Sequence, residues 1–202
     1  MPTALYRLIL SCLLLLPLAV FADDASDFAA ANNSAQAQLL ESWAAQPVPA
    51  RVELINSLQQ GQVTVDGQVK TLRLNNRLRG LIDTALASHQ LLASDPKLRL
   101  SAAQQLQKSA KPAQLHFLDR QLAGETDSDV HSALSLALAN LQLVDPDPAV
   151  RLAAVRLLGE TGEPLARTRL ENLLQPGVEA DAGVRTAAET SLAQVKRKLL
   201  IG

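Results

Sequence analysis

The sequence is poor in the residues that build many ligand sites. Aromatic residues make up only 2% of the 202 residues, which leaves few rings to stack on bases or sugars. The 19 Lys and Arg nearly balance the 20 Asp and Glu, so the chain has neither a basic field for phosphates nor an acidic tail. We therefore expect neither nucleic acid nor carbohydrate as a ligand.

The only cysteine, Cys12, lies in an N-terminal segment that is typical of a secretory signal peptide. Residues 1–22 combine an early cation, Arg7, an apolar run over residues 8–21, and a small residue, Ala22, before the expected cleavage point. An uncleaved membrane anchor is the alternative, although the run is short for a bilayer span. We expect an exported, periplasmic protein whose mature chain has no thiol, disulfide or cysteine metal site.

The remaining sequence falls into three parts. Residues 23–34 are rich in Ala, Asn, Asp and Ser and predict a flexible lead-in. Residues 35–92 predict an N-terminal helical segment, because apolar residues recur at helical spacing and Pro or Gly ends the runs. A small hairpin at residues 62–74 should interrupt it, since β-branched residues flank an Asp-Gly turn at residues 66–67. The expected helices of this segment span residues 35–45, 50–60 and 76–92.

An internal repeat organises the third part, residues 93–202. Its template is an Asp, often followed by Pro, then an apolar residue, Arg and small residues; the copies begin at Asp95, Asp127, Asp147 and Asp181. Asp caps a helix. Pro suits the first helical position because the backbone N–H group that it lacks would have no partner inside the helix. Further helices open at Pro112 and Pro164. The copy spacings of 32, 20 and 34 residues fit helix pairs, except that the Asp127 copy should lack its second helix.

This template resembles the HEAT-like repeats of the short, bilin-lyase type, which implies a right-handed stack of antiparallel helix pairs. We expect an all-α fold: a HEAT-like α-solenoid with one small β-hairpin in the N-terminal half. Arg99, Arg151 and Arg185 each follow a capping Asp by four residues. They could pair with that Asp inside one helix or form a ladder between stacked repeats.

No motif of high specificity for catalysis or cofactor binding occurs, neither a nucleophile elbow nor a phosphate loop, dinucleotide fingerprint or zinc motif. The only histidines, His89, His116 and His131, are too isolated to predict a metal site. The acidic residues between positions 119 and 129 are explained by helix capping and the helix dipole. We predict a protein that is not an enzyme, with no catalytic residue, metal or cofactor.

The most unusual local sequence is residues 72–80, where the hairpin is followed by a helix. Several hydrogen-bond donors crowd this junction: Asn75, Asn76, Arg77 and Arg79. Asn76 could simply cap the helix while the arginines form a solvated basic face. The alternative is a partner-binding site, because interfaces favour fixed polar donors and Arg.

The order of segments also resembles one family, the N-terminal extracytoplasmic region of the urea ABC transporter permease subunit, of the branched-chain amino-acid type. The segments that carry this resemblance are Asp24-Ala-Ser-Asp-Phe28, Leu39-Leu-Glu-Ser-Trp43, and residues 72–82, 85–92, 145–155 and 158–162. In that family the chain continues into membrane helices that form the urea pathway, whereas this sequence ends about where the first should begin. The resemblance implies a non-catalytic domain that contacts the solute-binding protein or the permease.

Membrane association would then come only from such a permease part or from an uncleaved N-terminal segment, and would place the domain at the inner membrane. A free-standing periplasmic HEAT-repeat scaffold with other protein partners is the alternative function. A third alternative is an enzyme of the bilin-lyase kind. The predicted export and the lack of a nucleophile argue against it.

Overall fold

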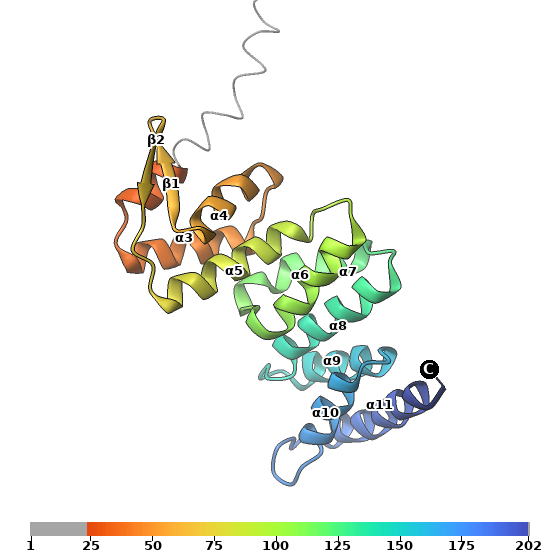
Figure 1. Cartoon of the computed structure of the whole chain (residues 1–202). Coiled ribbons are helices and arrows are strands. Elements are labelled where there is room, and N and C mark those ends of the chain that lie inside the picture. Colours follow the sequence, from red (N-terminus) through yellow and green to blue (C-terminus); the bar gives the residue numbers. More distant parts are fainter. Residues whose placement is uncertain (1–23, 202) are drawn as a thin grey trace, which may run out of the picture. The chain divides into compact units, whose positions relative to one another are not determined.

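The computed structural model describes residues 24–201 (Figure 1). The predicted signal peptide and Cys12 lie outside these residues. The described chain is mainly helical with one two-stranded antiparallel sheet, which confirms the predicted all-α class with a small hairpin. It divides into two compact units between His89 and Gln90, three residues before the predicted start of the repeat segment.

The first unit packs short helices and the hairpin around one core. Its elements are α3 (Asn33–Ala45), η1 (Pro49–Arg51), α4 (Val52–Gln59), β1 (Gln62–Val65), β2 (Gln68–Thr71) and α5 (Asn76–Gln90). Predicted and observed helices agree to within a few residues. The fully buried residues at its centre include Leu40, Ile55, Leu58, Leu78 and Ile82.

The predicted flexible lead-in is the main difference from the expectation. Residues 24–30 are helical, and Phe28 is fully buried with its ring 5.8 Å from that of Trp43. Asp24 accepts a 2.8 Å hydrogen bond from Nε of Arg51, and the side-chain amide of Gln36 donates to the Phe28 carbonyl. The prediction was wrong because polar composition hid one aromatic anchor, which buries a large apolar area.

The hairpin forms around the predicted turn. Asp66 and Gly67 both have positive φ, 53° and 74°, as the tight turn that matches strand twist requires. The register pairs Val65 with Gln68 and Val63 with Lys70. Val63 and Val65 are buried while β2 is exposed along its length, so only one strand contributes to the core.

The second unit contains the repeat. Its elements are α6 (Pro96–Ser109), η2 (Pro112–Gln114), α7 (Leu115–Gly124), α8 (Ser128–Gln142), α9 (Pro148–Glu160), α10 (Pro164–Leu173) and α11 (Ala182–Ile201). Asp95, Asp127, Asp147 and Asp181 each accept from backbone N–H groups at the start of the next helix, which confirms all four predicted caps.

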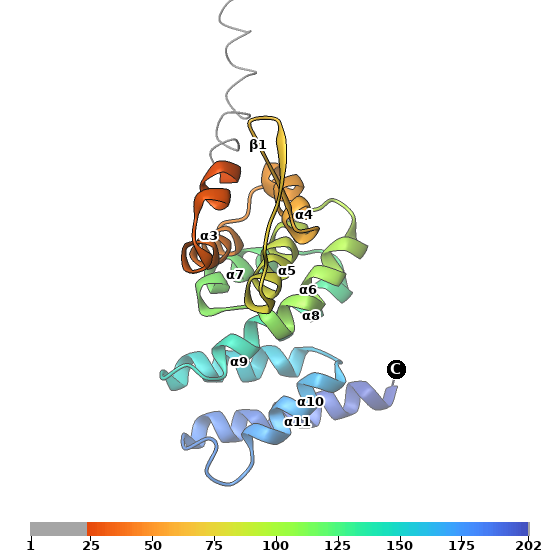
Figure 2. The same cartoon turned by 60° about the vertical axis from the view of Figure 1, so that its left-hand side comes forward.

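The four helices that follow these caps, hereafter the template helices, pack in the order α6, α8, α9, α11, while α7 packs on α8, and α10 on α9 and α11. Figure 2 shows α9 and α11 side by side. As predicted, α8 lacks a second helix, because residues 143–147 join it directly to α9. This short connection makes α8 and α9 antiparallel. In contrast, α6 and α8 are parallel, because α7 lies between them in sequence and returns the chain to the starting end of α6.

Among the described residues, none of the helices combines the length and the apolar character that crossing a bilayer requires.

Candidate functional site

The predicted partner-binding residues lie together at the start of α5, and all four are exposed. Asn75 rather than Asn76 caps the helix: its Oδ1 accepts from the Leu78 N–H at 2.9 Å, and its carbonyl accepts from the Arg79 N–H. The cap falls one residue earlier than predicted because Leu78, which must face the core, fixes the start of the helix. Asn76 is therefore free of a capping role and lies on the surface.

The arginines of this junction are weakly paired. Nη2 of Arg77 lies 4.0 Å from a carboxylate oxygen of Glu41, and the Arg77 side chain is 70% exposed. Arg79 has no carboxylate within 4.0 Å among the described residues; it lines a small cleft of about 140 Å³ with Leu74, Ile82 and Asp83. The junction thus presents Arg79 beside a partly apolar cleft, while Arg77 faces Glu41.

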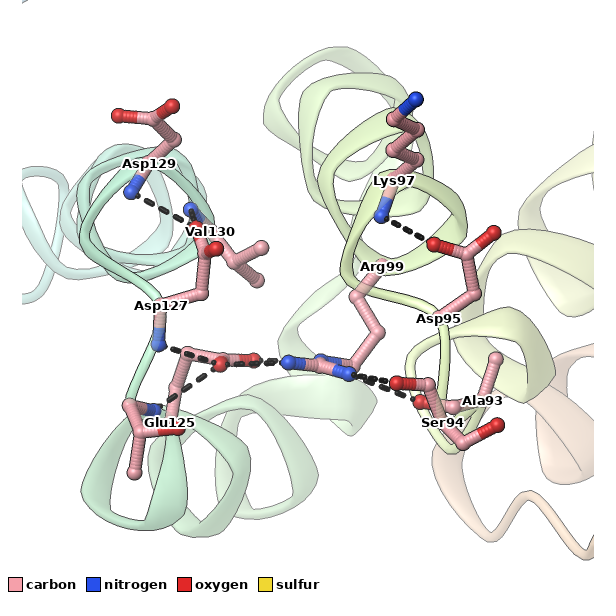
Figure 3. Close-up of polar contacts among 10 residues, drawn as sticks. Ala93, Ser94, Asp95, Lys97, Arg99, Glu125, Asp127, Asp129 and Val130 are labelled. Carbon is pink, nitrogen blue, oxygen red and sulfur yellow. Dashed lines mark hydrogen bonds and ion pairs between the residues drawn. The ribbon is translucent and has the colours of Figure 1, made fainter.

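A second polar arrangement, not predicted in this form, links template helices of the repeat (Figure 3). Arg99 of α6 donates from Nε and Nη2 to both oxygens of Glu125, at 2.8 and 2.9 Å. Its Nη1 donates to the carbonyls of Ala93 and Ser94. One Glu125 oxygen also accepts from the Asp127 N–H, so the pair ties α6 to the loop that begins α8.

The same arrangement recurs between the other two parallel template helices, α9 and α11. Arg151 of α9 donates from Nε and Nη2 to the oxygens of Glu179, at 2.7 and 2.8 Å, and from Nη1 to the carbonyls of Asp145 and Pro146. Glu179 also accepts from the Asp181 N–H at 2.8 Å. These two bidentate pairs, hereafter the Arg–Glu clamps, form the predicted ladder between repeats, but with Glu rather than the capping Asp.

The clamp is missing where the neighbouring template helices are antiparallel. A clamp needs the N-terminal ends of two helices side by side, since Arg lies in the first turn and Glu just before the next cap. The α8–α9 step places the start of α9 at the end of α8 instead. Accordingly the Arg position of α8 holds His131, and Asp145, at the Glu position, accepts from the Asp147 N–H.

Both clamp carboxylates are held in the charged form. Glu125 and Glu179 each have a pKa lowered from 4.5 to about 2, chiefly by the hydrogen bonds from Arg99 and Arg151, with desolvation opposing. The Glu179 side chain is only 2% exposed. Because these groups are paired ions between helices, we assign them a structural role.

The histidines are dispersed. His116 is exposed and His131 half-buried, whereas His89 is buried and its Nδ1 lies 2.7 Å from the Ala85 carbonyl oxygen. Burial lowers the pKa of His89 to about 4. Within residues 24–201, no group of three or more His, Cys, Asp or Glu is arranged to hold a metal ion.

A broad groove of about 860 Å³ runs along α9 and α11. Leu152 and Arg156 line one side, and Thr186, Ala187 and Thr190 line the other. Its walls are small or polar, which favours a peptide or helix surface over a compact apolar ligand.

Comparison with known proteins gave no match, either to a protein-family model or to a curated protein.

Proposed function

We propose that this chain is a non-catalytic, extracytoplasmic protein-contact domain of a urea ABC transporter permease subunit of the branched-chain amino-acid type. It acts by docking to the solute-binding protein or to the outer face of the permease. The observation that carries the contact role is the exposed junction of Asn75, Asn76, Arg77 and Arg79. The transporter assignment rests on the segment resemblance.

The junction has the properties of a docking surface. The Asn75 cap and the buried Leu78 fix the backbone, so the arginines are presented from a rigid helix start. Arg79 borders the cleft beside Ile82, and Arg is enriched at the centres of interfaces because its fork binds carboxylates while its stem packs on apolar surface. An acidic surface with an apolar contact is the partner chemistry that fits.

The test is binding of the purified chain to the solute-binding protein and permease of the same transport system, measured by cross-linking and by titration. Replacing Arg77 and Arg79 with Ala should weaken binding at least about tenfold. Helical content and melting temperature should stay nearly unchanged, since exposed side chains contribute little to folding.

Arg120→Ala/Arg169→Ala is the matched control, because both residues are exposed and neither is paired with a carboxylate in the described chain. Binding equal to wild type after the Arg77/Arg79 change would reject the junction as the site. Unfolding after that change would instead identify the junction as a structural clamp. Absence of any binding to either transport protein would reject the transporter role.

A further inference from the structure

The repeat carries three arginines at one equivalent position, and only two have a carboxylate partner. Arg99, Arg151 and Arg185 each lie four residues after a capping Asp. The first two form the Arg–Glu clamps with the next parallel template helix. Arg185, on α11, has no carboxylate within 4.0 Å among the described residues, and no described helix follows α11.

Arg185 nevertheless keeps one of the two carbonyl contacts that orient the other arginines, at a longer distance. In both clamps Nη1 donates to the carbonyl two residues before the capping Asp, which is Ala93 or Asp145. Nη1 of Arg185 donates to the carbonyl at the same position, that of Glu179, at 3.4 Å. This contact leaves the Nε and Nη2 edge without a hydrogen-bond partner in residues 24–201, and it is this edge that binds Glu in the clamps.

Arginine at this position correlates with a parallel neighbour. The template helix followed by an antiparallel neighbour, α8, has His131 there instead. A helix whose outer face only had to stay soluble would need polar residues there but not an oriented guanidinium with an open edge. The arginine of α11 therefore indicates a carboxylate supplied from outside the described chain.

We propose that Arg185 is a carboxylate-binding site through which the outer face of α11 docks a helix of a partner protein. That helix runs parallel to α11 and carries Glu or Asp two residues before its N-cap. The outer face has Glu189 and Ala193 where α9 has the buried Val155 and Gly159. The partner helix should accordingly offer a small or basic residue to Glu189 rather than a wholly apolar stripe.

A second copy of this chain fits less well. Stacked in the same direction, it would present its first template helix, α6, whose residue at the carboxylate position is Ala93. The carboxylates at the equivalent positions of α8 and α11 are already used in the Arg–Glu clamps. Asp145 precedes α9, which lies between α8 and α11.

The test uses a displayed library of single helices that start with x-x-Asp-Pro, in which the first position and the outward helix positions are randomised. Selection on the full chain should enrich Glu or Asp at the first position. Selected peptides should bind Arg185→Ala at least about tenfold more weakly, because a bidentate charged pair is lost. Arg185→Lys should also bind more weakly, since Lys keeps the charge but lacks the fork.

Arg169→Ala, an exposed and unpaired arginine on α10, is the matched control and should bind like wild type. The proposal is overturned if no peptide is enriched, if the enriched peptides lack an acidic first position, or if Arg185→Ala and Arg185→Lys both bind as well as wild type. The outer face of α11 would then be a plain polar surface. Thermal melting of each variant checks that it is folded, and Arg185→Lys decides the outcome if Arg185→Ala is unfolded.

Discussion

The guanidinium of Arg151 donates to both carboxylate oxygens of Glu179, 28 residues further along the chain, at 2.7 and 2.8 Å. This pair joins the first turn of α9 to the loop before α11, and the Asp181 N–H donates to the same carboxylate. The bond thus fixes the spacing of two parallel helices and the start of the second one.

Glu179→Gln should lower the free energy of unfolding by about 1 to 3 kcal/mol, because it leaves a half-buried guanidinium without its charged partner. Urea denaturation at neutral pH measures this. Glu171→Gln is the control: Glu171 pairs with Arg167 of α10 and with Lys196 of α11, all on the surface, and exposed pairs contribute little. Equal effects of the two substitutions would show that the clamp is no stronger than a surface ion pair.

The clamps also predict an acid-sensitive stability. The pKa of Glu125 and Glu179 is lower in the folded chain, about 2, than the ordinary 4.5. Their stabilising contribution is therefore complete above pH 4.5 and is lost as the pH falls from 4.5 towards 2. We expect the urea midpoint of wild type to fall across this window, and that of Glu179→Gln to fall less. Parallel curves would contradict the assignment.

The burial of His89 predicts a further loss of stability, in a higher pH range than that of the Arg–Glu clamps. Burial, aided by the positive charge of Arg51, lowers its pKa from 6.5 to about 4, and its Nε2 has no hydrogen-bond partner within the described part of the chain. Because the folded state favours the neutral ring, stability should fall as the pH drops from 6.5 towards 4. In the His89→Leu variant the urea midpoint should change less with pH between pH 6.5 and pH 4 than in wild type. An unchanged pH dependence in that variant would exclude His89 as the cause.

Local features of the fold were predictable from the sequence because they depend on residues close together. Asp95 and Asp147 cap helices through N–H groups two residues away, and Asp66-Gly67 sets the hairpin turn. The partner of Arg99 was not predictable in this way, since it depends on which helices run parallel. A signal was present, however: Glu125 and Glu179 each stand two residues before a capping Asp.

The same distinction between local and tertiary causes applies to the junction of Asn75, Asn76, Arg77 and Arg79. Its exposure could be expected from its charge, whereas the cap at Asn75 depends on how Leu78 enters the core. Phe28 shows the same limit, because its burial depends on Trp43 and not on the polar residues around it.

Gly159 marks a close approach of α9 to α11. A Cβ at this position would lie 2.7 Å from Oγ and 2.9 Å from Cβ of Ser191, distances at which one helix must shift. Gly159→Ala should therefore cost about 1 to 3 kcal/mol through overpacking, even though Ala is the better helix former. Gly80→Ala is the matched control, because no heavy atom lies within 4 Å of its Cβ, and it should stabilise by about 0.5 to 1 kcal/mol.

The cause can be isolated by a double-mutant cycle with Ser191→Gly, which removes two of the three atoms that the new Cβ meets. The third atom, Oε1 of Gln194 at 2.8 Å, is the end of a flexible side chain that can turn away. Ser191→Gly alone should cost about 0.5 kcal/mol through lost helix propensity. In its background Gly159→Ala should be nearly neutral, so that the two effects are strongly non-additive. Urea denaturation of the four proteins measures the coupling, and additive free energies would show that the Gly159–Ser191 contact does not set the separation of α9 and α11.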